Sequence, residues 1–202
     1  MTDEEFYGSA YPCLKDAEKI LLKLVSKYQE MEKKKKITSI EKCQSRIKSA
    51  DSMTAKLNRM GFEATLDSAL HQVYDAIGIR IICGFVDDVY QVADWLSKQP
   101  EIEIIAKKDY IAYPKPNGYR SYHLQIKMKT NTTLNLFAEI QIRTMAIDFW
   151  ATLEHQLKYK KDIAHEALIR SELKRCADEI AATDLSMQTI RDFIEGSNKY
   201  NL

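Results

Sequence analysis

Apolar residues recur at intervals of three and four near both ends of the chain, which is the spacing of one face of an α-helix. In residues 10–36 this row consists of Leu14, Ala17, Leu21, Leu24, Tyr28 and Met31. In residues 165–195 it consists of Ile169, Leu173, Cys176, Ile180, Met187, Ile190 and Ile194, and Gly196 follows as an expected end. The pattern therefore predicts a helix near each end of the chain.

The middle of the chain alternates between strand and helix patterns. Stretches with β-branched or alternating apolar residues predict strands at 38–49, 77–85, 101–110, 121–129 and 133–143. Helices are expected at about 50–60, where Ser49 or Asp51 can cap the start and Gly61 can close the end, and at about 87–99 and 144–159. The whole chain, 1–202, is thus predicted to be one α+β domain with a mixed sheet of about five strands, flanking helices and helical terminal elements.

Polar side chains alternate with the apolar ones along several of these strands. Because alternate residues of a strand share a face, the apolar positions predict one face of the sheet packed on helices. The opposite face then collects Arg46, Lys48, Arg80, His123, Glu139 and Gln141. The alternative is the solvent-exposed face of an antiparallel sheet, which is common.

The segment DYIAYPKPNGYRSYH, residues 109–123, forms a stiff corner between two predicted strands. Two prolines restrict the backbone around Lys115, and the Asn-Gly pair suits a tight hairpin turn. Aromatic groups that can stack on a flat ring (Tyr113, Tyr119, Tyr122) flank groups that can meet phosphate (Lys115, Arg120, His123). The segment is interpreted either as a nucleotide-binding corner or as a surface hairpin with amphipathic tyrosines.

Composition narrows the function only slightly. The 202 residues have a net charge of +1, so an anion site must come from clustered side chains. The four cysteines and four histidines show no zinc-ligand spacing, which predicts reduced thiols and no structural zinc. The N-terminal stretch lacks the apolar segment of a signal peptide and no run has the length of a membrane span, so we expect a cytoplasmic protein without membrane contact.

Two carboxylates accompany the predicted cationic face: Asp75, just before a buried strand, and Glu139, within another. Magnesium is usually held by one or two carboxylates together with substrate phosphates. The residue types therefore fit a site for polyphosphate and Mg²⁺. Because the chain has no G-x-x-x-x-G-K-[ST] motif, side chains would have to bind the phosphates.

Four segments together resemble the synthetase domain of RelA/SpoT-type alarmone synthetases, and the chain length points to the single-domain small alarmone synthetases. They are RIKSADSMTAKLNRMG, YDAIGIRIIC, DYIAYPKPNGYRSYH and AEIQIRTMAIDFWATLEHQLKYK, in that order between about 40 and 160. The resemblance implies a fold related to polymerase-β-like nucleotidyltransferases. It also implies transfer of pyrophosphate from ATP to the 3′-hydroxyl of GTP or GDP, giving (p)ppGpp and AMP.

The resemblance assigns a role to each candidate residue. ATP would be held by Arg46, Lys48, Ser52, Lys56, Arg59 and Arg80, with Arg46 and Arg80 on either side of the adenine. Asp75 would bind Mg²⁺, and Glu139 would bind the metal or accept the proton of the hydroxyl. Because its cationic surroundings should keep Glu139 ionised, we favour metal binding or orientation of the hydroxyl over proton acceptance. Tyr119 would stack on guanine, with Lys115, Asn117, His123 and Gln141 nearby, and Arg143, Glu154 and His155 would support them. Tyr113 stands where the family more often has Asn.

Several alternatives stay open at this level. Some small relatives pyrophosphorylate the 3′ end of tRNA, for which the lysine runs at 33–36 and 158–161 are the candidate contacts; both also suit solvated helix ends. A catalytically idle nucleotide- or RNA-binding regulator is a third interpretation. Small members of the family form homotetramers, so we expect the terminal helices to contact other copies; packing of both helices onto the sheet of the same chain is the alternative.

Overall fold

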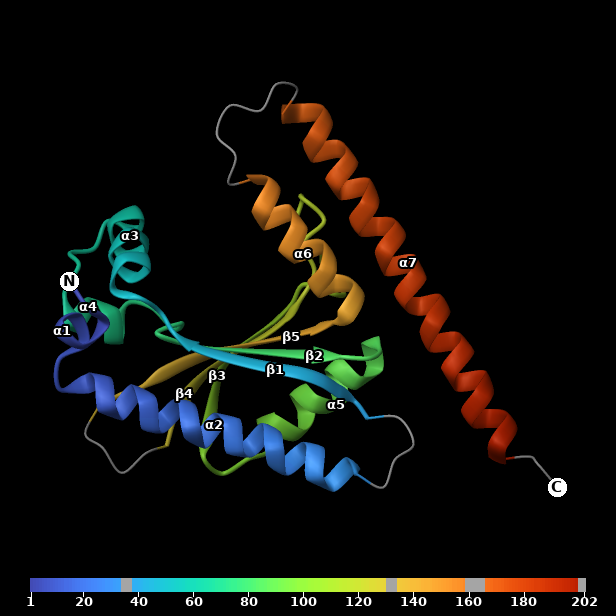
Figure 1. The fold of residues 1–202 in the computed structure, drawn as a ribbon, viewed down its shortest axis with the longest axis horizontal. Coiled ribbons are helices and arrows are strands. Elements are labelled where there is room, and N and C mark those ends of the chain that lie inside the picture. The colour runs from blue at the N-terminus through green and yellow to red at the C-terminus, as the bar shows by residue number, and fades with distance from the viewer. Residues whose placement is uncertain (34–37, 130–133, 159–165, 200–202) are drawn as a thin grey trace.

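The computed structural model describes residues 1–33, 38–129, 134–158 and 166–199. Its elements follow one another as α1 Asp3–Tyr7, α2 Ala10–Glu32, β1 Ile40–Ile47, α3 Ala50–Met60, α4 Leu66–His71, β2 Ile77–Cys83, α5 Val86–Ser97, β3 Ile102–Asp109, β4 Tyr122–Met128, β5 Phe137–Thr144, α6 Met145–Lys158 and α7 Glu166–Lys199 (Figure 1). The predicted strands and longer helices are all present. The expected α+β architecture is confirmed.

The five strands form one mixed sheet in the order β1-β2-β5-β4-β3. Strands β2 and β5 are parallel, and the other three neighbouring pairs are antiparallel. The parallel pair lies at the centre, where β2 is buried along most of its length. This agrees with its nearly continuous apolar sequence, which is typical of a strand covered on both faces.

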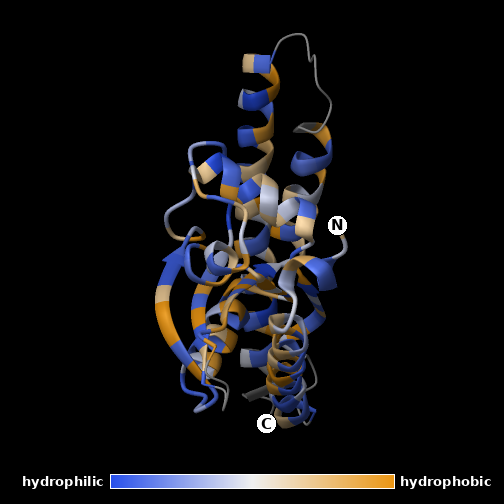
Figure 2. Ribbon diagram, turned by 90° about the vertical axis from the view of Figure 1, so that its left-hand side faces the viewer, coloured by the Kyte–Doolittle hydropathy of each residue, from blue (hydrophilic) through white to orange (hydrophobic). Residues whose placement is uncertain are grey.

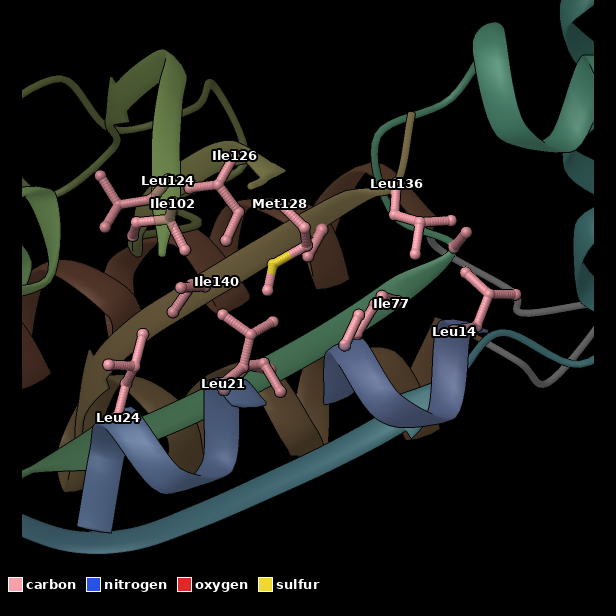
Figure 3. Close-up of a cluster of buried hydrophobic side chains, with 14 of the residues drawn as sticks. Leu14, Leu21, Leu24, Ile77, Ile102, Leu124, Ile126, Met128, Leu136 and Ile140 are labelled. Carbon is pink, nitrogen blue, oxygen red and sulfur yellow. The ribbon is translucent and has the colours of Figure 1, made fainter. Parts of the chain in front are cut away.

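Helices α2 and α5 cover one face of the sheet, and α3 and α6 stand on the other (Figure 1). Leu14, Leu21 and Leu24 of α2 point into a cluster with residues of β2, β4 and β5, among them Ile77 and Ile140 (Figure 3). The apolar row of α2 is therefore buried against the sheet of its own chain from Leu14 to Tyr28, while Met31 at its end is exposed. For this helix the structure supports the intramolecular alternative, not a surface that is free for another copy.

The C-terminal helix α7 packs along α6 on the polar side of the sheet. Leu173, Cys176 and Ile180 contact a small cluster around Trp150 and Ala177, so part of the predicted apolar row is also covered within the chain. Hydrophobic and hydrophilic positions alternate along α7, whose C-terminal end is marked in Figure 2. Past Ile180 several apolar side chains of α7 remain exposed, including Met187, Ile190 and Phe193.

Some sequence-based expectations were wrong. The helices α1 and α4 were not predicted, because they have 5 and 6 residues and are too short to show a periodic pattern. Gly196 does not end α7, which continues to Lys199. The Asn-Gly corner is not a tight hairpin, since the loop 110–121 separates the antiparallel strands β3 and β4.

Two observations bear on earlier expectations about surfaces. Of the lysine runs, Lys34 to Lys36 and the stretch 159–161 lie outside the described residues. In the part of the chain that the structure describes, no helix combines the length and apolar character that crossing a bilayer requires.

Candidate functional site

The strand register brings the polar side chains into rows across one face of the sheet. Arg80 of β2 pairs with Gln44 of β1 and with Gln141 of β5, and Gln141 pairs with His123 of β4. In the next row Arg46, Gly78, Glu139 and Gln125 stand opposite one another. The prediction that these residues share a face is confirmed, and the rows show which of them are neighbours.

The first cavity lies on this face and has a volume of about 270 Å³. Its lining residues come from β1 and the segment after it, from β2 and the segment before it, and from β5: Gln44, Ser45, Arg46, Lys48, Asp75, Gly78, Ile79, Arg80, Glu139 and Gln141. Gly78 stands between Arg46 and Glu139, and the side chain of Arg46 lies over it, since a Cβ atom built on Gly78 would lie 3.7 Å from Cγ of Arg46. Gln44 was missed by the sequence reasoning, although strand alternation from Arg46 would have found it.

The second cavity has a volume of about 250 Å³. It is lined by Lys56, Met60, Gln72, Val73, Tyr74, Asp75, Lys108, Gln125 and Glu139. Of the residues that the structure describes, it shares only Asp75 and Glu139 with the first cavity. The two predicted carboxylates thus stand where two cavities meet, which is the arrangement that a reaction between two ligands requires.

Two ammonium groups contact Asp75. The Nζ atom of Lys48 lies 3.1 Å from Oδ2, and the Nζ atom of Lys56 lies 2.6 Å from Oδ1. The other two ATP-site candidates on α3 are placed differently: Ser52 belongs to the capping interaction with Ser49, and Ser52 and Arg59 are exposed and line neither cavity. Lysines at the carboxylate leave a cationic surface for phosphate oxygens beside Asp75.

Glu139 lies between hydrogen-bond donors on the same face. Its Oε1 atom accepts a hydrogen bond of 2.8 Å from Gln141, and its Oε2 atom lies 3.6 Å from Nδ1 of His123. Burial opposes ionisation, but the contacts with His123 and Gln141 and the nearby charge of Lys56 lower the pKa of Glu139 to about 2. The carboxylate is therefore ionised at neutral pH, as the sequence analysis expected.

A closed ring of contacts links Glu139 to the tyrosine of the loop. The hydroxyl of Tyr119 lies 3.0 Å from Nε2 of His123 and accepts a hydrogen bond of 2.9 Å from Arg143. Arg143 also donates to Oε1 of Gln141, which in turn donates to Glu139. The ring spans β4, β5 and the loop, so the position of Tyr119 is tied to that of the carboxylate.

A further carboxylate, Asp148 of α6, was missed by the sequence reasoning. It accepts a hydrogen bond of 3.0 Å from Arg143 and lies 3.7 Å from Arg80. Burial and the nearby charge of Arg143 lower the pKa of Arg80, while Asp148 raises it in part. An aspartate in the first turn of a helix is normally explained by the helix dipole, so the sequence offered no signal of this second role.

The loop 110–121 turns at Lys115–Gly118, where the amide of Gly118 donates to the carbonyl of Lys115. The ammonium of Lys115 lies 4.7 Å from the ring centre of Tyr110 and 5.1 Å from that of Tyr119. Asn117 donates a hydrogen bond of 3.2 Å to Glu154 of α6. Glu154 thus supports the loop through Asn117, whereas His155 is exposed on α6.

The unpredicted helix α1 supports the segment between β1 and α3. The hydroxyl of Tyr7, which is fully buried, donates a hydrogen bond of 2.7 Å to the carbonyl of Lys48. The Oδ1 atom of Asp3 accepts one of 2.7 Å from the amide of Ala50. Both contacts fix the backbone that carries Lys48, more than 40 residues away in the chain.

The donor set suits magnesium better than zinc. Within the described ranges, no group of three or more Asp, Glu, His or Cys side chains is placed to hold a metal ion. Asp75 and Glu139 supply two hard oxygen donors at the junction of the cavities, and Mg²⁺ commonly takes one or two carboxylates and completes its shell with water and substrate phosphates. The residues present therefore fit Mg²⁺ bound together with a nucleotide.

An α+β domain with two polar cavities meeting at a carboxylate pair defines a class of two-ligand transferases. A family model described as "Region found in RelA / SpoT proteins" matches residues 45–164. The chain belongs to the RelA/SpoT family, as the four motifs predicted.

Individual relatives resemble the chain over most of its length. The GTP pyrophosphokinase YwaC of Bacillus subtilis is 42% identical over 77% of this chain and 76% of its own. The GTP pyrophosphokinase YjbM of the same organism is 31% identical over 96% of this chain and 92% of its own. The crystal structure of small alarmone synthetase 1 from Bacillus subtilis, bound to its product pppGpp, matches with a TM-score of 0.84 at 30% identity and covers 95% of this chain and 99% of that one.

Proposed function

We propose that this protein is a GTP pyrophosphokinase that makes (p)ppGpp: it transfers pyrophosphate from ATP to the 3′-hydroxyl of GTP or GDP and releases AMP. The observation that carries the proposal is the pair of cavities that, among the described residues, have only Asp75 and Glu139 in common. A donor nucleotide in the first cavity and an acceptor whose base lies at the loop, outside both cavities, would meet at the two carboxylates if the 3′-hydroxyl of the acceptor reaches Glu139. The names of the relatives and the bound product of the matched structure support the same reaction.

The first cavity suits the donor, ATP. Arg46 is exposed and the side chain of Arg80 is 37% exposed, so both guanidinium planes are accessible for stacking on adenine. Lys48 and Lys56 stand at Asp75, where the transferred phosphates would lie. Ser52 and Arg59 lie on the same helix as Lys56 but outside the cavities. They would contact the triphosphate only where it extends out of the first cavity.

The acceptor, GTP or GDP, is placed at the loop. Tyr119 is partly buried and held at its hydroxyl by Arg143 and His123, which leaves a rigid ring for stacking on guanine. Lys115 lies on the same turn, where its exposed side chain would reach the phosphates, whereas Asn117, bonded to Glu154 and to the amide of Tyr119, would hold the turn in shape. His123 and Gln141 connect this region to Glu139, near which the 3′-hydroxyl would be oriented.

In the transfer, the 3′-oxygen forms a bond to the β-phosphorus of ATP, the bond between that phosphorus and the α,β-bridging oxygen breaks, AMP leaves with the electron pair of that bond, and the proton of the hydroxyl passes to water. Asp75 and Glu139 would hold Mg²⁺, which supplies neutralisation of the phosphate oxygens. Because the pKa of Glu139 is lowered to about 2, this carboxylate is a poor proton acceptor and is better suited to metal binding or to orienting the hydroxyl. Lys48 and Lys56 stabilise the charge that develops on the phosphates.

Incubation of the protein with Mg²⁺, ATP and either GDP or GTP tests this proposal. We expect AMP and a 3′-pyrophosphorylated guanosine nucleotide in equal amounts, and neither product when EDTA replaces Mg²⁺. Release of AMP only after addition of tRNA would contradict the proposal in favour of a tRNA-modifying enzyme. Nucleotide binding without any AMP would contradict it in favour of a regulator.

We further propose that the protein assembles into a homo-oligomer, with the homotetramer of the small family members as the expected form. Four exposed apolar residues recur every fourth position on α6: Met145, Phe149, Leu153 and Leu157. Together with the exposed residues of α7, such as Phe193, they form apolar surface that association would cover. Light scattering on wild-type protein and on the Phe149→Glu and Phe193→Glu variants tests this, and a monomeric wild-type protein would contradict it.

A further inference from the structure

The loop that carries Tyr119 rests directly on α7. Gly118 is buried and has φ +88°, and a Cβ atom built on it would lie 2.7 Å from the Cβ of Ala177 and 3.3 Å from the Cα of Lys174. On the other side of Tyr119, Arg120 forms an ion pair of 3.2 Å with Asp178 and also donates to the carbonyl of Gly118. Both neighbours of Tyr119 in the chain thus contact one turn of α7.

We propose that α7 is a positioning element for the acceptor nucleotide, with Ala177 and Asp178 as the residues that set where Tyr119 stands. This inference rests on the proposed function, in which Tyr119 stacks on guanine. Ala177 and Asp178 would not themselves contact the substrate. They act through the backbone of the loop.

The helix α7 is itself fixed on both sides of this contact. Before it, the indole nitrogen of Trp150 donates a hydrogen bond of 2.8 Å to the carbonyl of Leu173. After it, Thr144 donates one of 2.5 Å to Asp184, which is buried. Further along, Arg191 pairs with Asp87 at 2.6 Å. A helix held at these points cannot shift or rotate freely under the loop. The position of Ala177 relative to Gly118 is therefore fixed.

The hydroxyl end of Tyr119 is fixed independently. Arg143 and His123 hold the oxygen from the sheet, while α7 holds the backbone on either side of the residue. The side chain of Tyr119 is therefore held at two points, at its hydroxyl by residues of the sheet and at its backbone by α7. A change of even one methyl group at Ala177 would lift the backbone end while the hydroxyl end stays bound, and this would tilt the ring away from the stacking position.

The support also lies outside the family motifs. The match to the RelA/SpoT model ends at residue 164, and α7 begins at Glu166. The loop itself thus consists of motif residues, whereas α7, the helix on which it packs, lies beyond the matched segment. Substitutions on α7 would then alter the use of the acceptor without touching any motif residue.

Ala177→Leu tests the inference, with Ala182→Leu as the matched control, because Ala182 is exposed on the same helix. We expect Ala177→Leu to raise the KM for GDP or GTP by about tenfold or more and to leave the KM for ATP within about twofold, whereas Ala182→Leu changes neither. Equal increases in both KM values, or no change, would overturn the inference. A wild-type protein that releases no AMP would instead refute the proposed function, so the two failures are distinguishable.

A second pair of variants covers the case in which Ala177→Leu does not fold. Gly118→Ala should raise the KM for the acceptor, both because its Cβ meets that of Ala177 and because a side chain is strained at φ +88°, and adding Ala177→Gly should recover only the part that comes from the contact. Likewise, Arg120→Glu and Asp178→Arg should each impair use of the acceptor by a few-fold, the range of a partly exposed ion pair, and the double exchange should restore it. Absence of recovery in both double variants would overturn the inference.

Discussion

The guanidinium of Arg143 donates a 2.9 Å hydrogen bond to the hydroxyl of Tyr119, which joins the central strand β5 to the loop between β3 and β4. The same guanidinium lies 5.4 Å from the ring centre of Tyr119. Arg143 therefore restrains both the oxygen and the ring. A tyrosine held in this way loses little conformational entropy when a base stacks on it.

Replacement of Tyr119 should separate stacking from hydrogen bonding. Stacking on an aromatic ring contributes about 1–3 kcal/mol per base, so Tyr119→Ala should raise the KM for the guanosine substrate by about 5- to 150-fold with little effect on ATP. Tyr119→Phe keeps the ring and loses only the contacts with Arg143 and His123, so its effect should be smaller. Steady-state kinetics with each nucleotide varied in turn measures both, and an equal loss for ATP would contradict the stacking role.

Removal of either shared carboxylate should stop turnover without unfolding the protein. Asp75→Asn and Glu139→Gln keep the size of the side chain and remove one charge from the junction of the cavities. Because neutralisation by a bound metal contributes several kcal/mol, we expect AMP release to fall by roughly 100-fold or more in each variant. Circular dichroism is the control for the fold, and near-normal AMP release from either variant would refute the role assigned to that residue.

The lowered pKa of Glu139 predicts a specific dependence of stability on pH. The folded-state pKa of about 2 lies below the ordinary value of 4.5, so the ionised carboxylate stabilises the fold above about pH 4.5, and this contribution is lost as the pH falls toward 2. The difference of pKa corresponds to about 3 kcal/mol of unfolding free energy. Urea unfolding between pH 2 and 7 should show this loss in the wild type and not in Glu139→Gln.

Two further outcomes bear on the cause of the shift. His123→Ala should shrink the pH-dependent loss, because the contact with His123 is the main influence that lowers the pKa of Glu139. Stability curves of the wild type and Glu139→Gln that run parallel down to pH 2 would mean that the carboxylate has an ordinary pKa.

The N-terminal helix α1 should matter for the donor nucleotide. Tyr7→Phe leaves the carbonyl of Lys48 without its hydrogen bond in a buried position, which costs about 1–3 kcal/mol of stability. We expect a severalfold increase in the KM for ATP and an unchanged KM for the acceptor, with Tyr11→Phe on the following helix α2 as the control. A fall in stability with both KM values unchanged would show that the hydrogen bond has only a structural role.

Much of the fold followed from local patterns. A nearly continuous apolar run predicted β2, and helical periodicities predicted α2 and α5. Ser49 and Gly61 cap α3 as their residue types predict, with Gly61 at φ +80°. Strand alternation also placed Arg80, His123 and Glu139 on one face of the sheet, because side chains alternate strictly in an extended chain. The roles of those residues came from the resemblance to the family.

The tertiary structure decided which of these residues are neighbours. Strand order and register put Gly78 between Arg46 and Glu139, and neither can be derived from the pattern of a single strand. Three supporting contacts depend on packing between separate elements: Tyr7 with Lys48, Asp148 with Arg143, and Ala177 with Gly118. The sequence by itself thus determined the elements, the polar face and the family. The two cavities and the supports of the loop exist only once distant segments pack. They could not be predicted because such contacts have no periodic signature along the chain.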